Sequence, residues 1–365
     1  EAGVATPSVP AHRLEGIVNM GFLRNAWYAA AWADEIAAGS PVARTIIGDP
    51  VVMWRDEAGR PVALADICPH RLAPLSKGLQ QGNTLRCNYH GLRFNTLGEC
   101  VENPHGPLLK SLCVRSYPLV EHQGMLWIWM GQPAAADPVH IPDVLGFTVD
   151  APVHSWVKGA THVAANHKLF EDNILDPGHA DYLHPLLGGG GMSRSKRTVE
   201  ARGNQLYLHM WIDAWASPPI MAPEFADPAA PTDQWIEVWW HPCGAMLLRG
   251  GATPAGRPES EGIDTWTAHI YTPETQGKTH YFYASGRNYK VDDAGYNAGM
   301  AIGLKMAFEQ EDLPMIEAQQ QRIGNRDLME AGPQLFAMDS ASIRARRMYD
   351  RLLAAEQAQA SREAA

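Results

Sequence analysis

The sequence predicts an α+β fold, in which a small all-β domain precedes a larger domain built from an antiparallel sheet and a long helix. Short β-type runs separated by turn signals lie at residues 43–47, 51–54 and 61–64, and closing strands are expected within 101–130. Longer strand-like runs recur between residues 198 and 283, and a stretch with helical apolar spacing follows them. Strands followed by a covering helix are typical of an α+β domain.

The boundary between the two domains is predicted by a break in pattern after residue 130. The chain has 365 residues, which suits two domains better than one core. A Pro- and Ala-rich stretch with prolines at 133, 138 and 142 interrupts the strand pattern. We therefore place the first domain at residues 20–138 and the second at 139–355. Residues 1–19 are expected to be a flexible N-terminal extension, and residues 356–365 a C-terminal tail.

Individual elements follow from local patterns. Trp27 and Tyr28 are expected in the core of the first domain, and the alternation of Met125, Trp127 and Trp129 predicts a strand with its aromatic rings packed on one side. The strands of the second domain are expected at residues 205–211, 235–240, 245–249, 265–271 and 280–283.

Composition excludes several classes of function. The chain is 45% hydrophobic and 19% charged, as in ordinary globular proteins. A net charge of −10 argues against a nucleic-acid partner. No apolar run reaches the roughly 18 residues of a membrane span, and no signal pattern opens the chain. Cys100, Cys113 and Cys243 are predicted to be reduced thiols, so a cytoplasmic location is expected.

Two mixed Cys and His pairs form the strongest motif. Cys68-Pro69-His70 and Cys87-Asn88-Tyr89-His90 are separated by sixteen residues. Zinc fingers normally take both sulfurs from one pair and both imidazoles from another. In a Rieske [2Fe–2S] cluster, two Cys hold one iron and two His hold the other. The mixed pairs favour the cluster, and a structural zinc site is the alternative.

The same residues carry a resemblance to a known family. Cys68-Pro69-His70-Arg71 and Cys87-x-Tyr89-His90-Gly91-Leu92-Arg93-Phe94 resemble the signature of the Rieske non-haem iron aromatic oxygenases. The opening Met20–Tyr28 also resembles the start of their α-subunits. The resemblance implies a Rieske domain followed by a helix-grip catalytic domain, with Cys68, His70, Cys87 and His90 holding the cluster.

A second candidate metal site lies at His179 and His184. Two histidines near carboxylates suggest the 2-His-1-carboxylate arrangement of non-haem Fe(II) oxygenases. Residues five apart on an ideal α-helix point about 140° away from each other. A widened π-type turn between the two histidines would bring them together. Without other signals, a structural His pair is an equally good interpretation.

The resemblance to Rieske oxygenases assigns roles in this segment. Asp176-x2-His179-x4-His184 resembles the family's mononuclear iron motif. It implies that His179 and His184 ligate the iron and that Asp176 bridges His179 to a cluster histidine of a neighbouring subunit, most plausibly His90. Asn173 lies where the family has an asparagine near the iron, although a helix-surface amide is the alternative. Such partners orient an imidazole and tune its basicity.

The third iron ligand is expected at Asp312. This residue shares a helical apolar stripe with Ala301, Leu304, Phe308 and Ile316, and a buried carboxylate needs a partner or a metal. Its surroundings resemble the family segment that carries the ligand aspartate. Glu311 is the second choice. Pro314 should kink or restart the helix immediately afterwards.

Substrate contacts are a weaker prediction. Arg249 and His269 could bind a substrate carboxylate, and Tyr281 or Tyr283 could stack on an aromatic ring. Structural packing or a surface ion pair explains each of them equally well. The basic residues Arg194, Lys196 and Arg197 either face an electron donor or form a solvated loop.

Together, the motifs and the resemblance imply the terminal oxygenase of a multi-component system. Similarity to vanillate O-demethylase oxygenases and dicamba monooxygenase implies O2- and NAD(P)H-dependent O-demethylation of a methoxylated aromatic acid. A reductase or ferredoxin would donate the electrons, and a homotrimer would pair each cluster with a neighbour's iron. Ring hydroxylation or N-demethylation is the alternative chemistry. A non-catalytic electron carrier would need only the first domain, and a zinc-stabilised interaction protein would need neither iron site.

Overall fold

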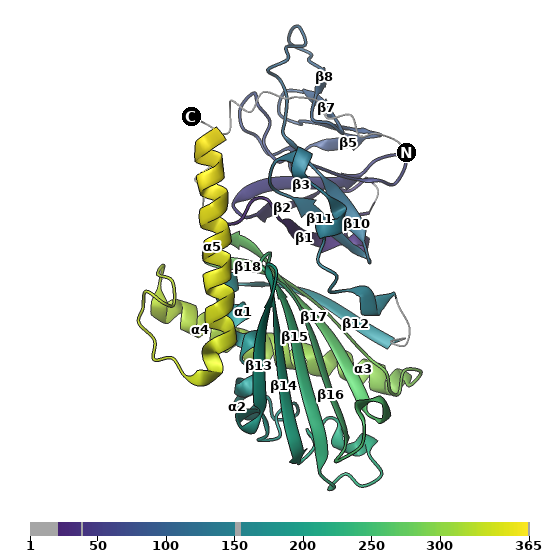
Figure 1. The fold of residues 1–365 in the computed structure, drawn as a ribbon. Coiled ribbons are helices and arrows are strands. Elements are labelled where there is room, and N and C mark those ends of the chain that lie inside the picture. Colours follow the sequence, from purple (N-terminus) through teal and green to yellow (C-terminus); the bar gives the residue numbers. More distant parts are fainter. Residues whose placement is uncertain (1–20, 38, 150–154, 364–365) are drawn as a thin grey trace. The chain divides into compact units, whose positions relative to one another are not determined.

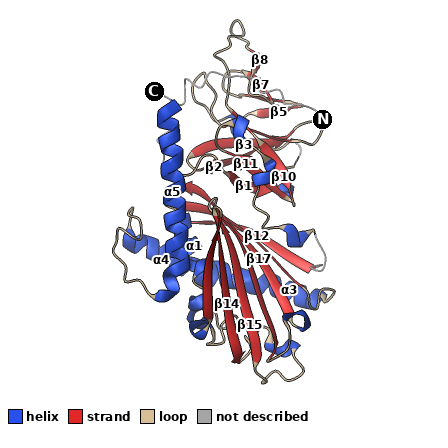
Figure 2. Ribbon diagram, in the orientation of Figure 1, coloured by secondary structure: helices blue, strands red, loops and turns tan. Residues whose placement is uncertain are grey.

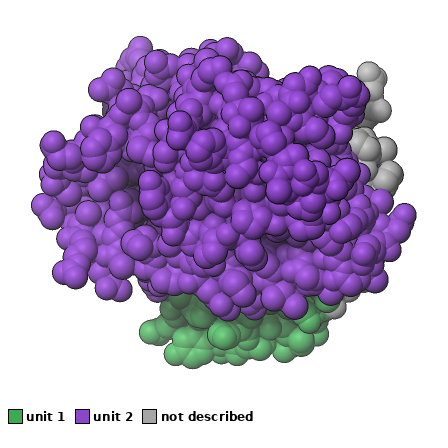
Figure 3. Space-filling model, turned by 90° about the horizontal axis from the view of Figure 1, so that it is seen from below, with its two compact units in different colours: residues 1–141, 272–275 green, residues 142–271, 276–365 purple. Residues whose placement is uncertain are grey.

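The computed structural model describes residues 21–37, 39–149 and 155–363. The predicted extension at residues 1–19 lies outside the described residues. The chain forms two compact units, Glu1–Ile141 with Thr272–Thr275, and Pro142–Tyr271 with Gln276–Ala365 (Figure 3). The division follows Ile141, three residues beyond the boundary placed from sequence, and the tip of a distant hairpin groups with the first unit.

The first unit is all β in its described part, as predicted. Its small antiparallel sheets have the orders β1-β11-β10, β2-β3-β4-β9 and β5-β6-β7-β8 (Figures 1 and 2). The strands are β1 (Trp27–Trp32), β2 (Val42–Ile46), β3 (Asp49–Arg55), β4 (Pro61–Ala65), β5 (Leu79–Gln81), β6 (Thr84–Arg86), β7 (Arg93–Asn95), β8 (Cys100–Glu102), β9 (Ser116–Tyr117), β10 (Leu119–His122) and β11 (Met125–Trp129).

The core of this unit contains the predicted aromatic residues. Trp27 and Tyr28 are 2% and 1% exposed, which confirms their assignment. Met125, Trp127 and Trp129 lie on the predicted strand, β11, and every residue of β11 is buried. β11 lies between β1 and β10 in its sheet, and a central strand buried on both faces needs no apolar–polar alternation.

The second unit is built on a seven-stranded antiparallel sheet in the order β12-β18-β17-β16-β15-β14-β13 (Figures 1 and 2). The strands are β12 (Ser155–Val163), β13 (Lys196–Arg202), β14 (Gln205–Trp215), β15 (Thr232–His241), β16 (Ala245–Pro254), β17 (Ile263–Thr275) and β18 (Lys278–Arg287). The predicted helix-grip architecture is confirmed. β14 to β18 are each longer than the apolar run that predicted them, whereas β12 and β13 were not among the predicted strands.

Two helices of the second unit lie between β12 and β13 in sequence, and the others follow β18. They are α1 (His167–Leu175), α2 (Ala180–Leu183), α3 (Ala294–Lys305), a π-helix (Met306–Asp312), α4 (Leu313–Ile323) and α5 (Ser340–Glu363). Pro314 stands in the first turn of α4, where its missing N–H costs nothing, so the helix restarts there as expected. α5 contacts α1 and β14. It continues through most of the segment assigned to a tail, because that segment is rich in Ala, Glu, Gln and Arg.

None of the helices in the described part of the chain combines the length and the apolar character that a bilayer crossing requires.

A buried carboxylate, Glu171 on α1, predicts how the stability of this unit depends on pH. Its Oε2 accepts a hydrogen bond of 2.7 Å from the Trp240 indole, and within the described residues its Oε1 has no hydrogen-bond partner. Burial raises the pKa of Glu171 from 4.5 to about 8. The folded state therefore holds a proton that the unfolded state releases, so the contribution of Glu171 to stability is complete below pH 4.5 and is lost as pH rises to about 8.

We expect Glu171→Gln to remove this pH dependence. Between pH 5.5 and pH 8.5 the parent should lose stability relative to the variant, by an amount on the order of 3 kcal/mol. Urea unfolding at both pH values measures the difference. Glu200→Gln is the control, since the Glu200 side chain is 56% exposed. Parallel pH profiles for parent and Glu171→Gln would contradict the expectation.

Candidate active site

The two Cys and His motifs of the first unit form equivalent loops. Cys68 N–H donates to Ala73 O at 2.8 Å, and Leu72 N–H donates to Cys68 O at 2.9 Å. The second motif repeats both hydrogen bonds. Cys87 N–H donates to Leu92 O at 2.8 Å, and Gly91 N–H donates to Cys87 O at 3.0 Å. The residue four positions after each cysteine has positive φ, 57° at Leu72 and 79° at Gly91. Gly91 in the second motif is therefore explained by the backbone turn.

The loops bring the four predicted ligands together with the cysteines inside and the histidines outside. Cys68 and Cys87 are each 2% exposed, whereas His70 is exposed and His90 is half-buried. The two imidazole rings are 4.4 Å apart between centroids. Burial, with Cys87 adjacent, raises the pKa of the Cys68 thiol to about 11. A bound metal cluster would supply the positive charge that ionises these thiols.

The spacing of these ligands fits two metal ions better than one. A tetrahedral zinc ion would gather all four ligand atoms within a few ångströms. Among the described residues, no three ligand atoms of this set lie within 4.8 Å of one another. Two buried sulfurs and two outer imidazoles suit a [2Fe–2S] cluster with Cys on one iron and His on the other. Cys100, Cys113 and Cys243 form no disulfide.

The second unit brings His179, His184 and Asp312 together. Their ligand atoms lie within 4.8 Å of one another. Asp312 Oδ1 is 3.5 Å from His179 Nε2 and 3.2 Å from His184 Nε2. His184 and Asp312 are buried, and two imidazoles with one carboxylate are the donors of the facial triad of non-haem iron enzymes. The residues present therefore fit a mononuclear iron ion.

The chain reaches this geometry by a route that differs from the predicted one. No π turn separates the two histidines. His179 ends a 3₁₀ turn (Pro177–His179), α2 follows, and His184 leaves the helix in an extended conformation with φ −115° and ψ 92°. The π-helix lies instead at Met306–Asp312, where it delivers the third residue of the set.

Each histidine is held through its Nδ1 atom, so that Nε2 faces Asp312. His179 Nδ1 is 2.6 Å from the backbone carbonyl of Asp176, and His184 Nδ1 is 2.7 Å from Glu311 Oε2. Asn173 Nδ2 donates to Asp312 Oδ1 at 3.0 Å, so the structure places this amide inside the site. The contact of Glu311 was missed from sequence, although its position beside Asp312 was the available signal.

Electrostatics couple the three groups. Burial acts to raise the pKa of Asp312, but hydrogen bonds from His179 and His184 outweigh burial and hold it well below its usual range. Burial acts to lower the pKa of His184, but Asp312 and Glu311 raise it above its ordinary value. The carboxylate of Asp312 is therefore ionised and suited to a divalent cation.

A cavity of about 530 Å³ borders this site. Its walls come from α1, α3, the π-helix and the inner face of β15 to β18, and most of them are apolar. Polar groups within it are few, and include Gln234, Thr267, His269 and Ser285. The Thr267 and Ser285 hydroxyls are 2.9 Å apart across β17 and β18. Such a volume with few polar groups is typical of a site for a small organic molecule.

Only one of the four predicted substrate residues lines the cavity. His269 lines the cavity, whereas Arg249, Tyr281 and Tyr283 are not among its lining residues. The Arg249 guanidinium is bound by Glu237 at 2.7 Å and by Asp264 at 2.9 Å, which explains its place outside. Tyr281 lies behind His269, with its hydroxyl 2.8 Å from His269 Nδ1, and the Tyr283 hydroxyl donates to Glu309.

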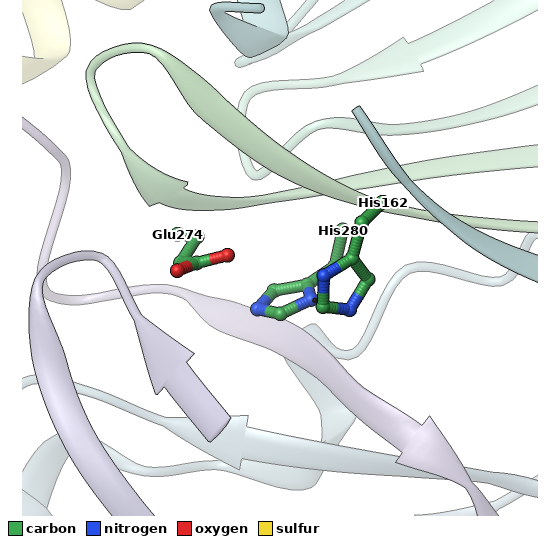
Figure 4. Close-up of side chains that lie close together, drawn as sticks. All are labelled: His162, Glu274 and His280. Atoms are coloured by element: carbon green, nitrogen blue, oxygen red, sulfur yellow. Dashed lines mark hydrogen bonds between the residues drawn. The ribbon is translucent and has the colours of Figure 1, made fainter. Parts of the chain in front are cut away.

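A further histidine pair lies on the sheet itself. His162 on β12 and His280 on β18 are register partners, and His280 Nδ1 is 3.0 Å from His162 Nε2. Figure 4 draws both rings together with Glu274 of the β17–β18 hairpin. Neither histidine lines the cavity, so this pair takes no part in the site described above.

Comparison with known proteins decides the family to which the chain belongs. The Rieske [2Fe-2S] domain model matches residues 26–118, and the vanillate O-demethylase oxygenase C-terminal domain model matches residues 163–355. The chain is 38% identical to the oxygenase component of dicamba O-demethylase from Stenotrophomonas maltophilia, over 91% of this chain and 98% of that protein. This chain is a Rieske oxygenase α-subunit.

Other members of this Rieske oxygenase family are similar over comparable lengths. The iron–sulfur subunit of the toluene-4-sulfonate monooxygenase system from Comamonas testosteroni is 36% identical, over 92% of this chain and 98% of that protein. A crystal structure of dicamba monooxygenase with non-heme iron and dicamba superposes with a TM-score of 0.79 at 37% identity, covering 93% of this chain and 99% of that one. The Rieske oxygenase assignment makes this chain an oxidoreductase, as predicted.

Proposed function

We propose that this chain is the terminal oxygenase of a multi-component system that demethylates a methoxylated aromatic acid. The observation that carries the proposal is the apolar cavity bordering His179, His184 and Asp312. A cavity of about 530 Å³ accommodates a substituted single ring. The resemblance to dicamba and vanillate O-demethylase components supports this chemistry. Neither an electron carrier nor a zinc-stabilised module needs such a cavity.

Cys68, His70, Cys87 and His90 would hold the [2Fe–2S] cluster, and His179, His184 and Asp312 would hold Fe(II). When bound, the cluster supplies single electrons and the mononuclear iron activates O2. A reductase or ferredoxin would bring the electrons from NAD(P)H. Per turnover, the methoxyarene, O2, NAD(P)H and one proton give the phenol, formaldehyde, NAD(P)⁺ and water. The hydroxylated methyl group forms a hemiacetal, which collapses to the phenol and formaldehyde.

The protein residues have separate tasks in this reaction. Asp312 is ionised in the buried site, and Asn173 donates to its Oδ1, which fixes the carboxylate. The apolar cavity wall excludes water from the reacting methyl group. Asp176 would contact a cluster histidine of a neighbouring copy, and repeated contacts of this heterologous kind close into the expected homotrimer.

His269 is the residue that we propose to bind the substrate carboxylate. Burial lowers the pKa of His269 to about 3, so the imidazole is neutral. Its Nδ1 lies 2.8 Å from the Tyr281 hydroxyl. If Tyr281 donates this hydrogen bond, the proton of His269 resides on Nε2, which then donates to an acid in the cavity. The substrate carboxylate would thus be bound by a neutral donor, because Lys290, which also lines the cavity, is paired with Glu224 at 2.7 Å.

We expect His269→Leu to raise KM for a methoxybenzoate substrate about tenfold to a hundredfold, because a hydrogen bond to a charged group contributes about 1.5–3 kcal/mol. Steady-state kinetics measure this effect. Thr265→Val is the control, since the Thr265 hydroxyl donates to Gly250 O and lines the same cavity. An unchanged KM in His269→Leu would contradict the assignment.

Formaldehyde release from a panel of methoxybenzoates, with a generic reductase, NADH and O2, tests the proposed function. We expect formaldehyde and a phenol in equal amounts. Oxidation of NADH without formaldehyde across the panel would overturn O-demethylation and favour ring hydroxylation or N-demethylation.

A further inference from the structure

Glu311 has a contact that the proposed reaction does not use. Its Oε2 lies 2.7 Å from His184 Nδ1, and its side chain is 24% exposed. His184 is 4% exposed, and its other ring nitrogen, Nε2, faces Asp312 Oδ1 at 3.2 Å. The imidazole is therefore held between two consecutive carboxylates of the chain, one at each nitrogen.

The π-helix makes this arrangement possible. On an α-helix successive side chains point about 100° apart, so neighbouring residues rarely reach the two ends of one ring. Glu311 and Asp312 end the π-helical segment Met306–Asp312, whose wider turn brings successive side chains closer in direction. π-Helical turns often occur at functional sites. Here the turn explains why both residues of the Glu-Asp pair reach His184.

The two histidines consequently differ in their Nδ1 partners. His179 Nδ1 meets a neutral backbone carbonyl, that of Asp176, at 2.6 Å. His184 Nδ1 meets the Glu311 carboxylate, and a carboxylate that accepts from a ligating imidazole fixes its tautomer and raises its basicity. Glu311 and Asp312 together also carry the two negative charges that balance a divalent ion in a cavity of low polarity.

We infer that Glu311 is the positioning residue of His184, holding Nδ1–H so that Nε2 presents its lone pair to the metal. This inference rests on the iron site proposed above. At that iron site, one turn of the π-helix provides both a metal ligand, Asp312, and the Glu311 carboxylate, which orients a second ligand, His184. His184 is then the stronger imidazole donor of the pair.

The test is the affinity of the mononuclear site for Fe(II), measured by chelator competition in full-length protein that retains its cluster. Glu311→Ala should weaken Fe(II) binding about 10- to 100-fold. Glu311→Gln keeps an amide oxygen that accepts from Nδ1, so we expect a loss below tenfold.

Glu309→Ala is the matched control. Glu309 lies on the same π-helix and accepts from the Tyr283 hydroxyl at 3.2 Å, but it does not line the cavity. The Glu309→Ala variant should bind Fe(II) with an affinity within twofold of that of the parent. If Glu311→Ala does not fold, Glu311→Met serves as the test variant instead, because a methionine fills the same space but offers no oxygen to accept a hydrogen bond from His184 Nδ1.

Two results would overturn the inference. One is Fe(II) affinity in Glu311→Ala within twofold of the parent, and the other is an equal loss in the Gln and Ala variants, which would assign the effect to charge alone. Failure of the proposed function would look different, because it would appear as absent formaldehyde in the parent protein with normal Fe(II) affinity.

Discussion

Asp176→Asn should lower turnover roughly 100-fold or more while leaving both metal centres occupied. The backbone carbonyl of Asp176, and not its carboxylate, lies 2.6 Å from His179 Nδ1, so the substitution leaves this ligand in place. The carboxylate Oδ1 accepts from Gly178 N–H at 3.2 Å and lies 3.4 Å from Arg197 Nη1. An asparagine keeps an oxygen that can accept from Gly178 N–H and Arg197, but it removes the negative charge that pairs with Arg197 and that would bridge to a cluster histidine of a neighbouring copy.

Product formation, iron content and the visible spectrum of the cluster together measure this effect. Asp181→Asn is a suitable control, because Asp181 lies in the same segment and accepts from the backbone of Gly190 and Ser193. We expect the control to keep turnover within about twofold. Near-normal product formation by Asp176→Asn with both metals bound would remove the bridging role.

His179→Ala should eliminate the mononuclear iron and reduce product formation to background, while the visible spectrum of the cluster stays unchanged. The remaining His184 and Asp312 leave one imidazole and one carboxylate, which is too few ligands for a stable facial site. The cluster ligands belong to the other unit of the chain and keep their own loops.

Iron stoichiometry, measured beside the absorption of the cluster, separates the two centres. His209→Ala provides the control, since His209 lies on β14, does not line the cavity and belongs to neither cluster of potential metal ligands among the described residues, so its removal should not change the iron content. If His179→Ala retained one iron per chain beyond the two irons of the cluster, His179 would not be a ligand.

Much of the candidate site could be predicted from sequence because most of its candidate ligands lie close together in the chain. Cys68 with His70, Cys87 with His90, and His179 with His184 are each within a few residues, so a short loop suffices to group them. Asp312 was also predicted, from a carboxylate on an apolar helical stripe together with the family resemblance. The fold class followed from strand runs and one break in composition.

Other features depend on packing that no local pattern encodes. Arg249 looked like a substrate anchor, but Glu237 and Asp264 lie on neighbouring strands, and only the sheet register brings them to its guanidinium. The π-helix occurs at Met306–Asp312 and not between the histidines, because the extended backbone at His184 already turns that side chain inward. The sequence made Glu311 the second choice for the third ligand. Its Oε2 lies 2.7 Å from His184 Nδ1, which fits the positioning role that we infer for it.

The most direct test of the proposed O-demethylation is a turnover under ¹⁸O2 with the preferred methoxybenzoate. Hydroxylation of the methyl group gives a hemiacetal, and its collapse breaks the bond between the methyl carbon and the ether oxygen. The phenol should therefore keep its original unlabelled oxygen and appear with an equal amount of formaldehyde. Mass spectrometry of the phenol, with labelled water as the exchange control, gives the answer. A phenol that carries ¹⁸O would show oxygen insertion at the ring and would contradict O-demethylation by this cavity.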